Sequence, residues 1–324
     1  MALMSTTFDD LPLTDRVRES CARVIEGAGL LTLNDDVLRQ LASDLDLSES
    51  APTQPIGRRS LDATPFTAAE TAETTLTFAL DAINFGSGYH DIVRKRPGRS
   101  GAQTMADALI EYISWTGPLG PDRLQNFTID DCSQIFGQEL DDGGLEELMS
   151  LFSTALNDLG EWLANNGGAE AVIAKADGSA EALAEHLTEM LFYRDVDSYS
   201  GEPVAFYKRA QITTADLARR VRPDLFDDLH RLTAFADNLV PHTLRMLGAL
   251  TLDEDLAAAI DGGVLLDPGS PAEVEIRAAG VVGVERLAAL SGARAMDIDA
   301  HLWERGQDPA IKRTPRHRAR SVFY

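Results

Sequence analysis

Cysteine, strand-forming sequence and long apolar runs are all scarce in this chain of 324 residues. The two cysteines, Cys21 and Cys132, are too few for a disulfide framework and lack metal-ligand spacing, which favours a reducing cytoplasm. No window approaches the roughly 20 uninterrupted apolar residues of a membrane span, so none is expected. The first ten residues lack a basic region followed by an apolar stretch, and no signal peptide is expected.

The chain is also poor in basic residues, with 29 Lys and Arg against 52 Asp and Glu and a formal net charge of −23. A field of that sign repels duplex DNA and anionic membranes, although a local basic pocket can still hold a small phosphate. Lys208 and Arg209 are the best candidates for such a pocket, because they follow the aromatic pair Phe206 and Tyr207 and are expected at a pocket rim. The alternative is that this cluster, like the other basic clusters, is a solvated helix face.

Signature motifs of common enzyme classes are missing as well. The sequence contains no phosphate-binding GxxxxGK[ST], no GxGxxG after a strand, no HExxH and no CxxC. Its six histidines show no ligand-like spacing, so a metal site is not expected.

What is present is overwhelmingly helical periodicity. Residues 67–84 begin with Thr67 and Glu70 at capping-box spacing, and residues 143–168 carry leucines on one stripe. The pattern over residues 270–292 predicts a helix. Ser270 is its expected N-cap and Pro271 its first residue, while Glu273 completes a capping box and Gly292 ends the helix. Shorter helices are expected at 179–191 and 213–221.

Strand-like runs occur only at residues 202–207 and 262–267. The expected fold class is therefore all-α, mainly helical, with at most a minor hairpin. We expect an N-terminal helical extension and loose connection over residues 1–65, of which 47–65 could form a lid, followed by one compact domain over residues 66–324.

One acidic residue stands in an otherwise mostly apolar run, "LTAFADNLVPHTLR". Asp237 lies four residues before Pro241, which indicates that a helix starts nearby. A carboxylate in such company is costly unless it is paired, hydrogen-bonded or used in chemistry. Capping of the new helix and a catalytic role are both consistent with this position.

Two further places combine polar groups with aromatic ones. Asp299 and Glu304 flank Trp303, although the two carboxylates also fit a solvated helix face and Trp303 a core position. Asn84 and Phe85 end an apolar helix, where they could hydrogen-bond and stack on a planar ring, although Phe85 as plain core is the commoner case.

At these same places the chain resembles the queuosine salvage protein family, the queuosine 5′-phosphate N-glycosylase/hydrolases. The matching motifs occur in the order "DAINFGSG", "FYKRAQI", "LTAFADNLVP" followed by "LGAL", "EVEIRA" leading to "VERL", "DIDAHLW" and "PRHRARSVFY". Together they span roughly residues 78–324.

The resemblance implies hydrolysis of the N-glycosidic bond of queuosine 5′-monophosphate, which releases queuine for reuse in tRNA modification. It also implies a single helical domain like that of the helix-hairpin-helix DNA glycosylases, and chemistry without a metal or redox cofactor. By motif position, Asp237 corresponds to the catalytic aspartate and Phe235 to an aromatic residue of the base pocket. Asp299 and Glu304 correspond to acidic ligand contacts. The sequence departs from the pattern at Ala300, where an aromatic is expected, and at Glu304, where Asp is expected.

For a small nucleotide of this kind, the residues divide the tasks by their chemistry. Asp237 would act on water at the ribose, and Phe235 with Phe85 would offer flat faces to the base. Lys208 and Arg209 would take the 5′-phosphate. A DNA-base glycosylase, a hydrolase of other purine nucleotides and a non-catalytic helical scaffold stay as alternatives.

Overall fold

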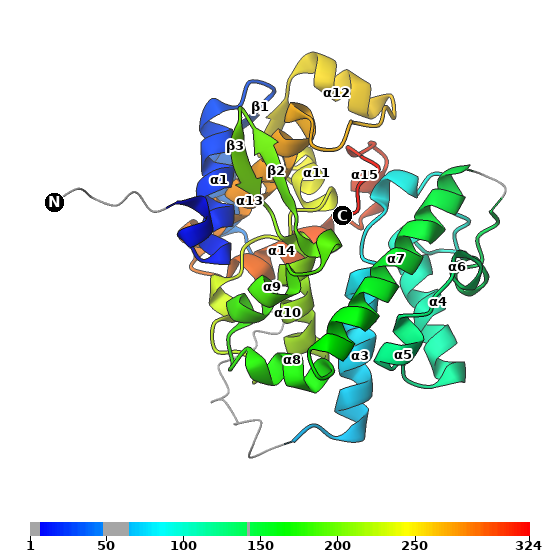
Figure 1. Cartoon of the computed structure of the whole chain (residues 1–324). Helices are drawn as coiled ribbons and strands as arrows, with labels where there is room; N and C mark the ends of the chain where they lie inside the picture. The colour runs from blue at the N-terminus through cyan, green and yellow to red at the C-terminus, as the bar shows by residue number, and fades with distance from the viewer. Residues whose placement is uncertain (1–6, 48–64, 141–142) are drawn as a thin grey trace. The chain divides into compact units, whose positions relative to one another are not determined.

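The computed structural model describes residues 7–47, 65–140 and 143–324, which are mainly helical, as expected (Figure 1). The predicted lid over 47–65 falls almost wholly on residues outside these ranges. The chain divides into two compact units. Of the described residues, the first comprises 7–47, 195–211 and 228–319, and the second comprises 65–140, 143–194, 212–227 and 320–324. The expected division between residues 65 and 66 stays a prediction.

The first unit is built around helix α13 (Pro271–Ser291), which packs against four other helices. These are α1 (Leu13–Gly27), α2 (Asp35–Ser43), α11 (Leu239–Met246) and α14 (Ala295–Arg305). The unit also contains η1 (Phe8–Asp10), the first turn of α10 (Lys208–Arg220), η4 (Leu229–Arg231), α12 (Glu254–Asp261) and α15 (Pro309–Lys312). Because α13 is buried on nearly all sides, it lacks the polar face of a surface helix.

The ends of α13 confirm most of the capping predicted from the sequence. Ser270 accepts a hydrogen bond from the backbone N–H of Glu273, Pro271 is the first helical residue, and Gly292 closes the helix with a φ of +75°. The predicted capping box is wrong in one respect. Glu273 Oε2 accepts from the N–H of Gly269 at 3.2 Å, because its carboxylate also faces the buried Arg277.

Two small antiparallel pairs complete this unit. Strand β1 (Leu31–Leu33) pairs with β4 (Leu250–Leu252), and β2 (Val196–Tyr199) pairs with β3 (Glu202–Ala205). The β2–β3 hairpin turns at Ser200 and Gly201, both with positive φ as in a type I′ turn. Strand β3 confirms the strand predicted at 202–207 for its first four residues, and Tyr207, with a φ of +49°, lies beyond its end.

The strand predicted at residues 262–267 is wrong. Gly263 has a φ of +79°, and the N–H of Val264 donates back to the carbonyl of Ala259. This is the hydrogen-bond pattern of a helix C-terminus, so these residues end α12.

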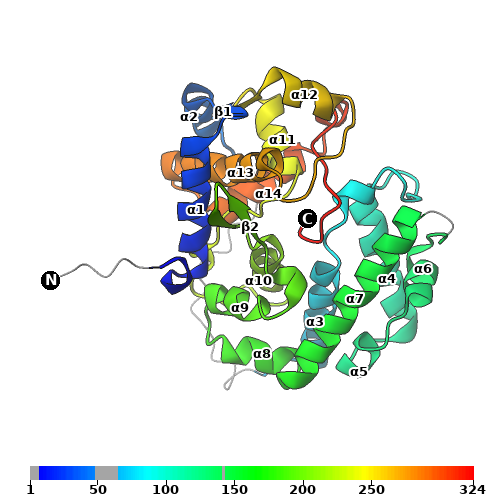
Figure 2. The ribbon, with the colours of Figure 1, turned by 45° about the horizontal axis from the view of Figure 1, so that its top comes forward.

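The second unit contains α3 (Ala68–Ala82), η2 (Ser87–Tyr89), α4 (Gly101–Thr116), α5 (Pro121–Leu124), α6 (Ile129–Phe136), α7 (Gly143–Asn165), α8 (Ala169–Lys175), α9 (Ala180–Leu187), η3 (Leu191–Tyr193) and the rest of α10. Helix α7 packs along α3, and α5 and α6 also lie against it (Figure 2). The predicted capping box of Thr67 and Glu70 starts α3.

Within the described parts of both units, no helix combines the length and the apolar composition that crossing a bilayer would require.

Candidate functional site

The segment from Leu232 to Asn238 leads into α11, and the first unit holds it at several points. Thr233 exchanges hydrogen bonds with the buried Gln211, whose Oε1 accepts from the N–H of Thr233 at 2.9 Å. The N–H of Phe235 donates to Asp299 Oδ1 at 2.9 Å. These partners come from α10 and α14, so two helices distant in sequence fix the path of the segment.

The second half of the segment is held in the same way. The carbonyl of Ala236 accepts a hydrogen bond from Arg277 Nε at 3.1 Å. The side chain of Asn238 donates to the carbonyl of His317 at 3.1 Å. Asp237, between these two anchored residues, therefore has a backbone position set by its surroundings before any ligand binds.

Asp237 uses one oxygen to begin α11. Its Oδ1 accepts hydrogen bonds from the N–H groups of Leu239 and Val240, at 2.8 and 2.9 Å. Its other oxygen, Oδ2, accepts no hydrogen bond from any residue that the structure describes, and the side chain is partly exposed. The carboxylate is thus a helix cap through one oxygen and open to a further partner through the other.

The surroundings of Asp237 change its affinity for protons. Burial raises the pKa of this carboxyl, and the raise is opposed by the N–H groups of Val240 and Leu239 and by the positive charges of Lys208 and Arg316. A carboxylate with a raised pKa is a stronger base than an exposed one, which suits proton transfer near neutral pH.

Lys208 and Arg209 lie in the first turn of α10 and are both buried, deeper than the rim position expected from the sequence. The N–H of Lys208 donates to Asp195 Oδ2 at 3.1 Å, which caps this helix. Tyr207, just before it, has a φ of +49° and turns the chain from β3 into α10. The Lys208 charge lies close enough to Asp237 to lower the pKa of that carboxyl.

The acidic pair predicted on α14 is divided between two environments. Asp299 is buried and holds Phe235, itself buried, through the hydrogen bond to its N–H. Glu304 is exposed five residues further along, and Ala300 is partly exposed. Trp303 is 40% exposed, so its interpretation as a core residue is wrong.

Asn84 and Phe85 belong to the second unit, where they follow α3. Phe85 is buried and makes edge-to-face contacts with Phe152 and Phe192, with ring centroids 5.2 and 6.0 Å apart. Asn84 is partly exposed and donates to Asp81 Oδ1 at 3.5 Å. These contacts are those of a core aromatic, and stacking on a ligand stays a prediction for Phe85.

Sequence reasoning missed Asp195. It forms a two-point ion pair with Arg277, with distances of 3.0 and 2.7 Å between the paired atoms. The buried ion pair of Arg277 is therefore with Asp195, while Glu275, on the same helix, accepts from the N–H of Leu30 and from the Tyr199 hydroxyl. No local pattern marks Asp195, because it stands in an ordinary loop before β2.

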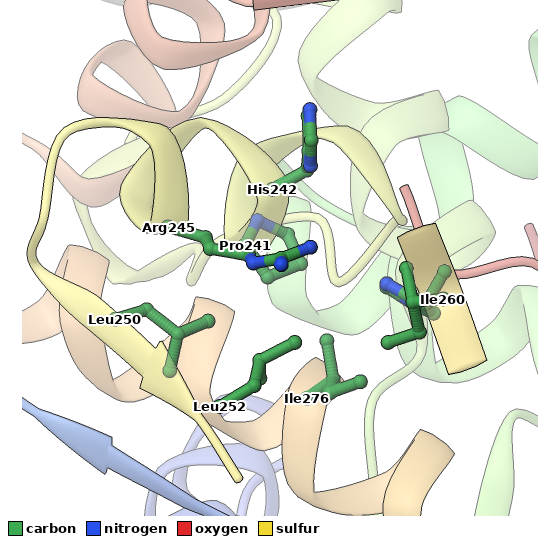
Figure 3. Close-up of a pocket in the computed structure, with 8 residues that line it drawn as sticks. Pro241, His242, Arg245, Leu250, Leu252, Ile260 and Ile276 are labelled. Atoms are coloured by element: carbon green, nitrogen blue, oxygen red, sulfur yellow. The ribbon is translucent and has the colours of Figure 1, made fainter. Parts of the chain in front are cut away.

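A cavity of about 10 Å³ lies in the first unit beside α11 (Figure 3). Pro241, His242 and Ile276 are among the residues that line it. Its volume admits at most about one water molecule, so it is not a site for a nucleotide. Burial lowers the pKa of His242, which donates to the carbonyl of Ile311 at 3.1 Å. Among the described residues, no three His, Cys, Asp or Glu side chains are grouped as metal ligands would be.

We expect Asp237→Asn to leave the protein at least as stable as the parent near neutral pH. The amide oxygen of Asn can still accept from Leu239 and Val240, so the cap is kept. Because the folded-state pKa of Asp237 is raised, ionisation favours the unfolded chain, and the parent loses stability as pH rises through that pKa. The relative stability of the variant should therefore increase from acid to neutral pH in urea unfolding. If the unfolding free energy of the variant instead decreased relative to that of the parent over this pH range, the raised pKa of Asp237 would be contradicted.

The chain is similar in sequence to known proteins of one family. A family model described as "Queuosine salvage protein" matches residues 65–324. The chain is 34% identical over 317 residues to a queuosine 5′-phosphate N-glycosylase/hydrolase of Sphaerobacter thermophilus, covering 93% of this chain and 95% of the relative. Relatives with the same name from Dictyostelium discoideum (34% over 212 residues, 63% and 65% covered) and Mus musculus (32% over 189 residues, 52% and 56% covered) are also similar.

Proposed function

Because this chain belongs to the queuosine salvage protein family, we propose that it hydrolyses the N-glycosidic bond of queuosine 5′-monophosphate and releases queuine. The assignment of the site rests on the hydrogen bonding around Asp237. Its backbone is anchored on both sides, its Oδ1 caps α11, and its Oδ2 accepts no hydrogen bond from the described residues. Such a carboxylate is preorganised to meet a developing positive charge.

The reaction needs a carboxylate because cleavage of the bond leaves an oxocarbenium-like ribose. As the bond from the ribose to the base breaks, the bonding electrons leave with the base. Asp237 stabilises the positive ribose carbon and takes a proton from the water whose oxygen bonds to that carbon. The leaving base takes up a proton from solvent and Asp237 releases the proton that it accepted, so the products are queuine and ribose 5-phosphate. We propose that Asp237 acts on water and forms no covalent adduct.

Recognition is proposed to follow the chemistry of the ligand. A guanine-like edge offers two adjacent donors to one carboxylate, and the ammonium of the substituent suits a second. Asp299 and Glu304 are proposed to divide these two tasks. Phe235 and Phe85 are proposed to stack on the base, and Ala300 to border it where the family pattern has an aromatic. Lys208 and Arg209 are proposed to bind the 5′-phosphate.

The direct test is to incubate the purified protein with queuosine 5′-monophosphate and to measure free queuine by mass spectrometry. GMP serves as the comparison substrate, since it carries the same phosphate and sugar but has a nitrogen at position 7 in place of the substituted carbon. Release of queuine without release of guanine supports the proposal. Absence of queuine at high protein concentration would contradict it, and release of both bases would point to a general purine nucleotide hydrolase.

Lys208→Ala is expected to reduce the preference for the 5′-monophosphate over the free nucleoside. The ammonium supplies a hydrogen bond to a charged group, worth about 1.5–3 kcal/mol, so the ratio of the two kcat/KM values should fall about 10–100-fold. Both kcat/KM values are measured for the parent and the variant. An unchanged ratio would show that the phosphate lies elsewhere.

We also propose that the protein acts on this small nucleotide in the cytoplasm and not on duplex nucleic acid. Its free cysteines, Cys21 and Cys132, are both buried, as fits a reducing compartment. The net charge of −23 opposes binding along a duplex backbone.

A further inference from the structure

Arg277 is a fully buried cation in the middle of α13, and its guanidinium has unusual neighbours. It lies over the ring of Phe206, with 3.9 Å from Cζ to the ring centroid. Its relative exposure is 0%, and Glu273 on the preceding turn approaches its Nε at 3.7 Å. Asp197 of β2 approaches its Nη1 at 3.6 Å. The guanidinium is therefore fixed in its plane by an aromatic ring and surrounded by carboxylates.

One edge of this planar group contacts the segment that carries Asp237, and another edge contacts Asp195, which in turn binds the start of α10. On one edge, Nε donates to the carbonyl of Ala236, the residue before Asp237, at 3.1 Å. On the other, Nη1 and Nη2 donate to the two oxygens of Asp195, at 3.0 and 2.7 Å. Asp195 in turn accepts from the N–H of Lys208 at 3.1 Å.

These contacts exceed what charge neutralisation requires. Asp195 alone would neutralise the guanidinium, and the hydrogen bond to a main-chain carbonyl adds no neutralisation. Its effect is geometric, because it ties the backbone next to Asp237 to the same rigid group that ties down the start of α10. A lysine would keep the positive charge, but its single ammonium lacks the planar fork that reaches all three acceptors.

We propose that Arg277, acting through Asp195, is a positioning residue that fixes the separation between the Asp237 carboxylate and the Lys208 ammonium. This inference rests on the proposed hydrolysis. The pair of Arg277 and Asp195 sets the distance from the Asp237 carboxylate to the Lys208 ammonium, whose positive charge lowers the pKa of Asp237. The geometry required for reaction is sensitive to displacements of about 1 Å.

The test is Arg277→Lys, which keeps the charge and removes the fork. We expect kcat for queuine release to fall about 10²-fold, the cost of a displacement of about 1 Å. We also expect the acidic limb of the kcat profile to move to higher pH, because Lys208 no longer stays where it lowers the pKa of Asp237. Since the variant keeps its charge at position 277, a shifted limb reports geometry.

The matched control is Glu275→Gln, a change at an equally buried charged residue of the same helix. Its partners, among them the N–H of Leu30 and the Tyr199 hydroxyl, lie outside the segment that carries Asp237. Glu275→Gln should keep the parent kcat and pH profile even if it lowers stability. Should Arg277→Lys fail to fold, Asp195→Asn offers the second variant, with the loss of kcat as its readout, because removal of the Asp195 charge itself alters the electrostatics around Asp237.

These measurements distinguish the proposed hydrolysis from the positioning role of Arg277. A parent protein that releases no queuine overturns the proposed function and this inference with it. An active parent, with folded Arg277→Lys showing the same kcat and acidic limb, or folded Asp195→Asn showing the same kcat, overturns the positioning role alone. A loss of kcat with a shifted limb in Arg277→Lys, or a loss of kcat in Asp195→Asn, supports it when Glu275→Gln keeps the parent kcat and limb.

Discussion

Asp237→Asn is expected to lower kcat for queuine release by at least about 10²–10⁴-fold, the range for loss of general acid–base catalysis. The amide can neither accept a proton from water nor offset the charge of the oxocarbenium-like ribose. It can still accept the hydrogen bonds of Leu239 and Val240, so α11 should keep its start and the fold should survive. Single-turnover release at saturating substrate measures the loss without a contribution from product dissociation.

A matched control separates capping from catalysis. Asp253 caps α12 by accepting from the N–H of Asp255 at 3.0 Å, and it occupies an exposed position. Asp253→Asn makes the same chemical change at another helix start, so it should leave kcat unaltered. If Asp237→Asn retained a rate close to the parent, the carboxylate would be only a helix cap, and the scaffold alternative would be favoured.

The second large effect is expected in stability. Replacing Arg277 with Met should cost about 3–5 kcal/mol of unfolding free energy near neutral pH, because removal of one partner of a buried ion pair leaves the other uncompensated. Here three carboxylates, those of Asp195, Asp197 and Glu273, would face one another without the guanidinium. Urea unfolding followed by circular dichroism measures the loss.

The pH dependence and a control test this explanation. Burial already raises the pKa of Asp197, and loss of Arg277 would raise it further. A folded-state pKa above the unfolded value means that the folded protein binds protons more tightly, so the variant should regain stability as pH falls through that raised pKa. Arg18→Met removes a partly exposed ion pair with Glu285 and should cost only about 1 kcal/mol. An equal loss of unfolding free energy in Arg277→Met and Arg18→Met would contradict the explanation by an uncompensated buried ion pair.

Much of the helical framework could be predicted because its signals are local. Thr67 and Ser270 lie within three residues of the N–H groups that they cap, so the starts of α3 and α13 can be recognised in a short window. The same locality explains the failure at residues 262–267. A short apolar run is compatible with a strand, and here the positive φ of Gly263 makes it the end of a helix.

For the site, the local sequence is enough to predict an acidic residue in an apolar run at the start of a helix, since Asp237 lies only four residues before Pro241. The surroundings of Asp237 depend on contacts between residues far apart in the chain. Asp299 holds Phe235 across 64 residues, and Arg277 meets Asp195 across 82. Such pairs leave no periodic trace, because their meeting depends on how whole helices pack. The charge that faces Asp237 is therefore set by the assembled core of the first unit, and not by any short stretch of sequence.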